Sequence, residues 1–299
     1  MLHLHYCGKY MNMSNFKENI IIIEIENSSF CNRQCNYCIC YHIDRISKNE
    51  IMPPYLFKKI IDELALINYD KIITFHRYNE PFFDKNEMIL ERISYAKKML
   101  PSATLMTSTN SDYLDEAYVQ EIRRAGLDAL YCQCHTEEYF NKNIEEIKES
   151  MLKINKIIGG FKGKFFVDQN SCVYTTVGSG FKCLTIQAKN FNEVGYPRGG
   201  IVEKVKRRKV TGLCYQPKIS MTIDYNGSVS MCSNTVSYEK SHEKYIFGNC
   251  MVNTVFDIYN CDQAVKLREK ITNGDREKIC LNCDCNYIKL EQNKKLKFW

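Results

Sequence analysis

Short apolar runs rich in β-branched residues alternate with longer amphipathic stretches over residues 20–190 of this 299-residue chain. This alternation is typical of a parallel sheet whose strands are connected by crossover helices. Pro54 stands near a helix start, and Gly126 and Gly159 stand just past helix ends, where these residue types are favoured. Strands are predicted at Ile20–Glu26, Ile72–Phe75, Thr104–Thr107, Ala129–Cys132, Lys164–Val167 and Thr185–Gln187, and helices at Pro54–Ile67, Asn86–Met99, Asp115–Ala125 and Ile144–Ile158.

The pattern changes after residue 190, where glycines and a basic run interrupt it. Two strands joined by an Asn226-Gly227 turn are predicted within Ile219–Met231, because this dipeptide favours tight hairpins. A helix is predicted at Gln263–Ile271. We therefore expect an N-terminal extension over residues 1–19, an α/β domain over 20–210 and a small hairpin-and-helix domain over 211–299.

Sixteen cysteines are the most unusual part of the composition. No secretory signal is visible and the longest purely apolar run, Ile20–Ile23, cannot span a bilayer, so we expect a cytoplasmic protein that does not enter the membrane. In that reducing compartment, clustered cysteines more often bind metals than form disulfides. The net charge of +6 is too small to indicate a nucleic-acid-binding protein, although the basic run Lys204–Lys209 keeps that alternative open.

The first cysteine group, Cys31, Cys35 and Cys38, has the spacing C-x3-C-x2-C and directly follows the first predicted strand. Three thiolates on one loop suit a cubane iron–sulfur cluster that keeps one iron open for a ligand. The loop begins at the carboxyl end of a strand, where parallel barrels bind their ligands. A structural zinc site completed by Cys40 or His42 is the competing interpretation, and ordinary buried cysteines are another.

This spacing, with the aromatic Tyr37 before the last cysteine, resembles the radical S-adenosylmethionine (SAM) superfamily. The resemblance implies a partial (β/α)6 TIM-like barrel, a [4Fe-4S] cluster whose open iron binds SAM, and a 5′-deoxyadenosyl radical that takes a hydrogen atom from the substrate. It also implies an electron donor such as flavodoxin or ferredoxin.

Two further segments match the superfamily at the ends of the second and third predicted strands. The first, Tyr78-Asn79-Glu80-Pro81, resembles the GGEP motif that holds the methionine amino group, with Tyr78 and Asn79 in place of the glycines. The second, Thr109-Asn110-Ser111-Asp112, resembles a TNGD segment near the ribose. By this resemblance Tyr37, Asn79, Glu80, Pro81, Thr109 and Asn110 are cofactor-binding residues.

A second cysteine group follows in the C-terminal region. The predicted hairpin brings its first two members, Cys214 and Cys232, toward each other. On spacing alone, four thiolates from two segments can hold zinc or an iron–sulfur cluster. The arrangement resembles the Twitch domain, a shortened SPASM domain that binds an auxiliary [4Fe-4S] cluster. Lys289 stands where a full SPASM domain would continue with cysteine, and Cys285 is an extra nearby thiol. The predicted ligands are Cys214, Cys232, Cys280 and Cys283.

Within the superfamily, the strings IEIENSSFCNRQCNYC, ITFHRYNEP and TSTNSDYL resemble the 2-deoxy-scyllo-inosamine dehydrogenases, which oxidise an alcohol to a ketone. The resemblance implies a small substrate, a polyol, aminocyclitol or sugar, with Arg198 contacting one of its oxygens. His76 and His135 are alternative proton acceptors or core histidines. A radical epimerase using the Cys134 thiol as hydrogen donor, and an enzyme that modifies ribosomal peptides, remain alternative functions.

Overall fold

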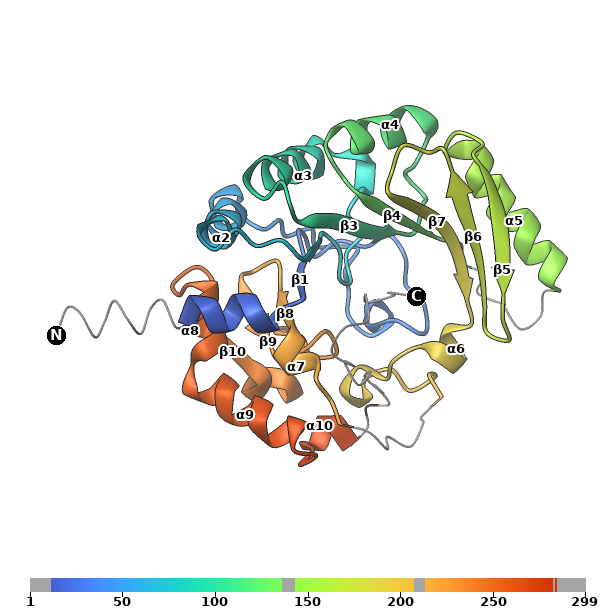
Figure 1. Ribbon diagram of the computed structural model, residues 1–299. Helices are drawn as coiled ribbons and strands as arrows, with labels where there is room; N and C mark the ends of the chain where they lie inside the picture. The colour runs from blue at the N-terminus through green and yellow to red at the C-terminus, as the bar shows by residue number, and fades with distance from the viewer. Residues whose placement is uncertain (1–11, 136–142, 207–212, 282, 284–299) are drawn as a thin grey trace.

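One curved, ten-stranded sheet organises the fold in the computed structural model, which describes residues 12–135, 143–206, 213–281 and 283 (Figure 1). The strand order is β10-β9-β8-β1-β2-β3-β4-β7-β6-β5. All neighbours from β8 to β7 in this order are parallel. These parallel strands are β1 (Ile22–Ile25), β2 (Ile72–Thr74), β3 (Thr104–Thr109), β4 (Ala129–Gln133), β7 (Cys183–Lys189) and β8 (Ser220–Ile223).

The first four crossover helices lie close to their predicted ranges and cover the outer face of the sheet (Figure 1). Polar side chains cap three of them, because Asn86, Asp115 and Asn143 each accept a hydrogen bond from a backbone N–H in the first turn. Apolar side chains between sheet and helices, such as Ile23 and Ile60, are fully buried. The helices are α2 (Pro54–Leu66), α3 (Glu87–Met99), α4 (Glu116–Arg124) and α5 (Ile144–Ile157).

The fifth strand differs from the prediction in the direction in which it pairs. β5 (Lys162–Val167) is a strand, but it pairs antiparallel with β6 (Ser171–Val177), a strand that the sequence pattern did not predict. The chain reverses within 168–170, where Asp168 N–H donates to the Ser171 carbonyl at 2.9 Å, so no crossover helix separates the two strands. β6 in turn pairs antiparallel with β7. The parallel expectation for Lys164–Val167 is therefore wrong, and a meander replaces one β/α unit.

The predicted C-terminal hairpin is a continuation of the same sheet. β8 pairs in parallel with β1, and β9 (Ser228–Ser230) pairs antiparallel with both β8 and β10 (Ile246–Asn249). Gly227 has a φ of +84° in the predicted turn, a conformation that glycine adopts without strain. The following helices are α8 (Val255–Asn260), α9 (Asp262–Thr272) and α10 (Lys278–Leu281), of which α9 contains the predicted helix. The predicted domain boundary near 210 falls outside the described residues.

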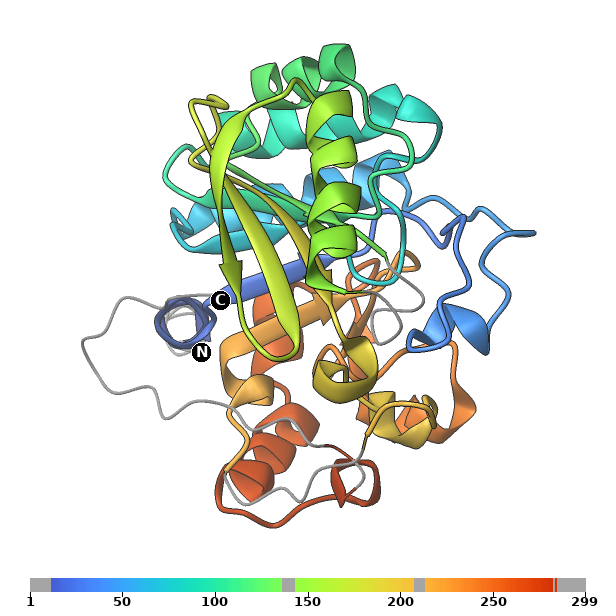
Figure 2. The same cartoon turned by 90° about the vertical axis from the view of Figure 1, so that its right-hand side faces the viewer.

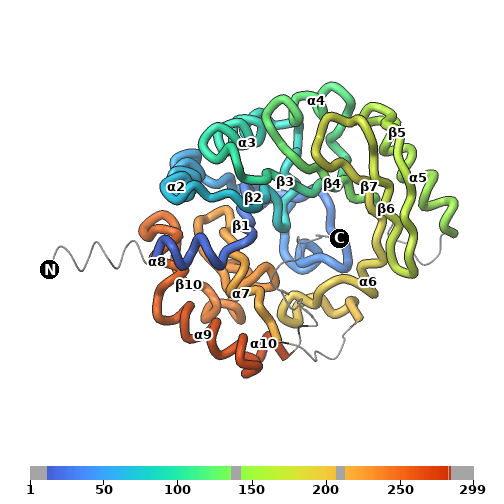
Figure 3. The backbone as a smooth tube through the Cα atoms, viewed as in Figure 1, coloured from blue at the N-terminus to red at the C-terminus, as the bar shows by residue number. Residues whose placement is uncertain are grey.

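Residues 12–19 form a helix that packs against the C-terminal region. Phe16 meets the rings of Phe256 and Tyr259 edge to face, with centroids 5.2 and 5.4 Å apart. Figures 2 and 3 show the loop that follows β1 lying across one end of the open barrel. Within the part of the chain that the structure describes, every helix is too short or too polar to cross a bilayer.

Candidate active site

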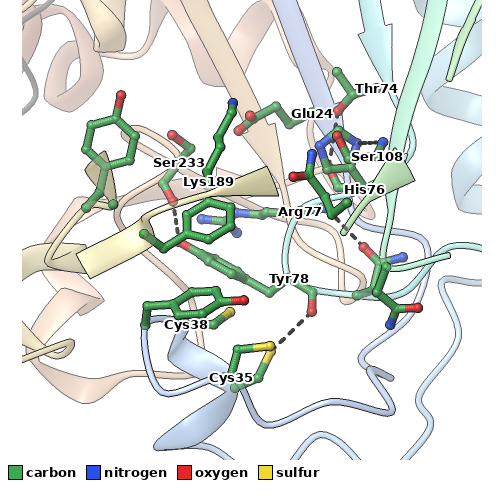
Figure 4. Close-up of a pocket in the computed structure, with 18 of the residues that line it drawn as sticks. Glu24, Cys35, Cys38, Thr74, His76, Arg77, Tyr78, Ser108, Lys189 and Ser233 are labelled. Atoms are coloured by element: carbon green, nitrogen blue, oxygen red, sulfur yellow. Dashed lines mark hydrogen bonds between the residues drawn. The ribbon is translucent and has the colours of Figure 1, made fainter. Parts of the chain in front are cut away.

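A cavity of about 690 Å³ opens at the carboxyl ends of the parallel strands. Side chains from the loop after β1, from the ends of β2, β3 and β4, and from the segment after β7 form its wall. In Figure 4, Cys35 and Cys38 lie at one side of this space, Glu24, Thr74 and Lys189 lie at the other, and Arg77 and Tyr78 lie between them. The predicted site residues in the wall are Cys31, Cys35, Tyr37, Cys38, Asn79, Glu80, Thr109, Asn110 and Arg198.

The three cysteines of the first group all face this cavity. A backbone hydrogen bond from Cys38 N–H to the Cys35 carbonyl (2.9 Å) tightens their loop. Burial raises the pKa of the Cys35 thiol to about 11, whereas the interaction with the neighbouring Cys40 thiol lowers the pKa of Cys38 to about 6. Metal binding favours the thiolate in both cases.

The cysteine loop fits a cubane cluster better than a single ion. No three Cys, His, Asp or Glu side chains converge as ligands of one ion anywhere in the described ranges. Each protein ligand of a cubane binds a different iron, so its cysteines surround a volume instead of meeting at one point. Of the two candidate fourth zinc ligands, His42 is exposed, whereas the buried Cys40 thiol lies beside the Cys31 and Cys38 thiols and 3.3 Å from the Tyr78 carbonyl.

Glu80 is the most constrained carboxylate in the cavity wall. It accepts hydrogen bonds from Thr109 Oγ1 (2.6 Å), Asn110 N–H (2.7 Å) and Phe82 N–H (3.1 Å). Burial nevertheless raises the pKa of Glu80 to about 7, because no cation among the described residues pairs with it. Asn79 Nδ2, also buried in this wall, has no hydrogen-bond partner among the described residues. A ligand with an ammonium group would pair with the Glu80 carboxylate, and a hydrogen-bond acceptor on the same ligand would accept from the Asn79 amide. The amino acid end of SAM has both groups.

Aromatic rings line the side of the cavity next to the first cysteine group. Tyr37 stacks on Phe191 with ring centroids 4.5 Å apart, and its hydroxyl lies 2.5 Å from His135 Nδ1. Burial lowers the pKa of His135 to about 4, so this imidazole is neutral at physiological pH. Phe191 was not predicted, and its only signal in the sequence is an aromatic residue two positions after the end of β7.

The opposite side of the cavity is polar and was largely missed by sequence reasoning. Glu24, an acidic residue inside the apolar run of β1, accepts one hydrogen bond from Thr222 Oγ1 (3.2 Å) and belongs to none of the ion pairs found among the described residues. Burial raises its pKa. His76 accepts a hydrogen bond from Ser108 N–H (3.0 Å), and burial lowers its pKa to about 4. Lys189 at the end of β7 completes this side.

The structure places the two predicted catalytic residues differently. Arg198 lines the cavity, with its guanidinium 5.1 Å from the centre of the Tyr78 ring and donating to Asn234 Oδ1 at 2.8 Å. Cys134 belongs to the apolar core and is not part of the cavity wall. Pro81 is likewise buried outside that wall.

The C-terminal cysteines come together around a second, small cavity of about 20 Å³. Burial raises the pKa of Cys214 and Cys232, and that of Cys280 to about 12, so these thiols need bound cations to ionise. Asn234 Nδ2 donates to Cys283 Sγ at 3.6 Å. These four thiols line one small cavity, and together they would supply the ligands of a closed, all-cysteine site. Cys285 lies outside the described residues.

Comparisons with known proteins agree with this arrangement. Residues 25–160 match the family model of the radical SAM superfamily, and residues 214–284 match the SPASM model, an iron–sulfur cluster-binding domain. The chain is 24% identical over 274 residues to the S-adenosyl-L-methionine-dependent 2-deoxy-scyllo-inosamine dehydrogenase of Niallia circulans, covering 91% of this chain and 95% of that protein.

Two solved structures of BtrN share the fold. The complex with AdoMet and 2-DOIA matches with a TM-score of 0.65 and 22% identity, covering 89% of this chain and 93% of that one. An open conformation matches with a TM-score of 0.57 and 20% identity, covering 90% and 92%. These matches confirm the predicted fold class, a parallel α/β sheet with a C-terminal iron–sulfur domain.

Proposed function

Because this chain is a radical SAM enzyme with a C-terminal SPASM domain, we propose that it oxidises one alcohol of a small aminocyclitol, polyol or sugar to a ketone. Its cofactors are SAM and iron–sulfur clusters. The bound cofactors supply a 5′-deoxyadenosyl radical that removes a hydrogen atom from the substrate carbon. The chain's own residues bind and orient the reactants and take up the proton.

One observation carries the proposal: the first cysteine group, Glu80 and a wall of polar side chains all open into the same cavity. A hydroxyl-rich molecule would find donors and acceptors there from Thr74, Ser108 and Lys189. The likeness to a dehydrogenase over most of both chains supports the same class of substrate.

The residues on the cysteine side of the cavity would hold SAM. Cys31, Cys35 and Cys38 would ligate three irons of the cluster, and Glu80 would pair with the ammonium group of SAM. That pairing would return the raised pKa of Glu80 toward its ordinary value, because an adjacent cation stabilises the carboxylate. The Asn79 amide would donate to an oxygen of the same ligand, and Tyr37 would pack against it.

Glu24 is our candidate for the group that takes the proton from the substrate hydroxyl. It lines the cavity, it has a single hydrogen-bond donor, and burial raises its pKa, so it is a stronger base than an exposed carboxylate. His76 is less suitable because its Nδ1 already accepts a hydrogen bond and burial lowers its pKa to about 4. Arg198 remains a proposed contact to a substrate oxygen.

The test is an anaerobic assay of the reconstituted protein with reductant, SAM and panels of aminocyclitols, polyols, sugars and peptides. Dehydrogenation predicts 5′-deoxyadenosine together with a product that has lost two hydrogen atoms, and a Cys35→Ala variant should form neither. A product of unchanged mass that has acquired solvent deuterium would replace the dehydrogenase proposal with epimerisation. A modified peptide would replace the small substrate.

A further inference from the structure

Tyr78 lies between the two cysteine groups, in the position where the superfamily motif has its first glycine. Its ring is 5% exposed and packs in an apolar cluster with Ile39, Cys40 and Val236. Cys31 and Cys38 pack against the same cluster. One face of this aromatic side chain is therefore part of the surroundings of the first cysteine group.

The other end of Tyr78 reaches the C-terminal cysteine group. Its hydroxyl donates a hydrogen bond of 2.5 Å to the carbonyl of Ser233, which directly follows Cys232 (Figure 4). On the opposite side, the Tyr78 carbonyl accepts the Cys40 thiol at 3.3 Å. Covalent bonds and hydrogen bonds therefore run without a break from Cys40 through Tyr78 to Ser233. Ser233 adjoins Cys232, a predicted ligand of the second site.

Two guanidinium groups fix the ring in this position. Arg77 and Arg198 lie 5.2 and 5.1 Å from the ring centre, and both are anchored in the C-terminal region. Arg77 forms an ion pair with Asp224, and Arg198 donates to Asn234 Oδ1 at 2.8 Å. Cations on a ring face disfavour loss of an electron from the ring. Tyr78 is therefore suited to connect two redox groups without itself being oxidised.

We propose that Tyr78 is a positioning residue that couples the two cysteine-bound clusters electronically, through its ring and its hydrogen bond to Ser233. The inference rests on the proposed function. After hydrogen abstraction, the substrate radical loses one electron and its hydroxyl proton passes to a cavity base, which leaves a carbonyl group. An auxiliary cluster held by the C-terminal cysteine group would accept this electron. Tyr78, which lines the cavity and donates to Ser233, would lie on the electron's path, and no bond to Tyr78 would form or break.

The first test needs neither SAM nor substrate. In the cluster-loaded protein, an electron introduced by flash photoreduction should equilibrate between the two clusters more slowly in Tyr78→Phe, which lacks the hydroxyl, and slowest in Tyr78→Leu, which also lacks the ring. Iron content and midpoint potentials should match the wild type. Tyr225→Phe, a tyrosine of the C-terminal region outside the cavity wall, is the matched control and should equilibrate at the wild-type rate.

The second test separates electron exit from hydrogen abstraction. Both Tyr78 variants should still form 5′-deoxyadenosine but yield less ketone for each molecule formed. If Tyr78→Phe has its full iron content and equilibrates at the wild-type rate, the inference is wrong. If Tyr78→Leu does not retain its clusters, the result for Tyr78→Phe decides by itself. A wild type that forms no ketone would overturn the proposed function instead, while the equilibration rates still decide the role of Tyr78.

Discussion

The ion pair between Arg77 and Asp224 should contribute strongly to stability, because it joins the end of β2 to the end of β8 in a dry environment. The two side chains are only 2% and 0% exposed. In Asp224→Asn, the amide oxygen can still accept the hydrogen bond from Ser237 N–H (2.8 Å), but Arg77 keeps a buried charge without a counterion. Removing one partner of a buried pair costs about 3–5 kcal/mol. For a chain of 299 residues, with an unfolding entropy of about 2.1 cal/mol/K per residue, that corresponds to a decrease in Tm of roughly 5–8 °C.

Anaerobic thermal unfolding of the cluster-loaded protein measures this effect, with iron content determined on the same samples. The double variant Arg77→Met/Asp224→Leu should recover much of the lost stability, since it removes both charges and leaves apolar side chains of similar size. Asp275→Asn is the matched control. The Asp275 carboxylate lies 3.7 Å from its partner Lys270, and both side chains are more than 40% exposed. Loss of this ion pair should lower the free energy of unfolding by about 0–1 kcal/mol.

The reasoning fails if Asp224→Asn unfolds within about 1 kcal/mol of the wild type. It also fails if the double variant is no more stable than the single one, because the penalty would then not come from the unpaired charge. A loss of iron in Asp224→Asn without a loss of Tm would instead assign the pair to cluster binding.

Four further predictions concern the cavity and the clusters. Glu80→Gln should weaken SAM binding about 10- to 100-fold, as expected for one lost hydrogen bond to a charged group, measured by equilibrium binding to the cluster-loaded protein. Because the pKa of Glu80 is raised to about 7, the protein without SAM should lose stability as pH rises through 7, and this loss should be absent in Glu80→Gln. Glu24→Gln should lower ketone formation while 5′-deoxyadenosine still appears, and the wild-type rate should fall as pH drops through the raised pKa of Glu24, a dependence that the variant should lose. Cys232→Ala should lower the iron content and keep SAM binding, so an unchanged iron content would remove Cys232 from the ligand set.

The sequence predicted those elements in which local pattern and tertiary role agree. β4 is buried along nearly its whole length, so its apolar run predicts a buried parallel strand directly. β6 was missed because its string SCVYTTV alternates buried and partly exposed residues, so it lacks the continuous apolar run that is typical of a buried parallel strand. The pairing of β8 with β1 was also not predictable, since it joins strands almost 200 residues apart without a local signal.

In the candidate site, residues that belong to a sequence motif were predicted, whereas residues that only the folded cavity brings together were not. Cys31, Glu80 and Asn110 were predicted because each stands in a motif with recognisable spacing, and all three line the cavity. Glu24 was missed because a lone acid in an apolar strand carries no signal until the strand's face is known. Cys134 was selected for its chemistry at a strand end, but alternation along that segment turns it into the apolar core.

The C-terminal region contributes residues to the cavity wall. Because β8 runs parallel to β1, the residue after β8, Asp224, arrives at the same sheet edge as Arg77 after β2. The segments flanking this hairpin then contribute Gln216, Ile219 and Ser233 to the cavity that the first cysteine group also lines. A substrate bound in this cavity would contact both halves of the chain, so changes in the C-terminal cysteine group and changes in substrate binding are expected to affect one another.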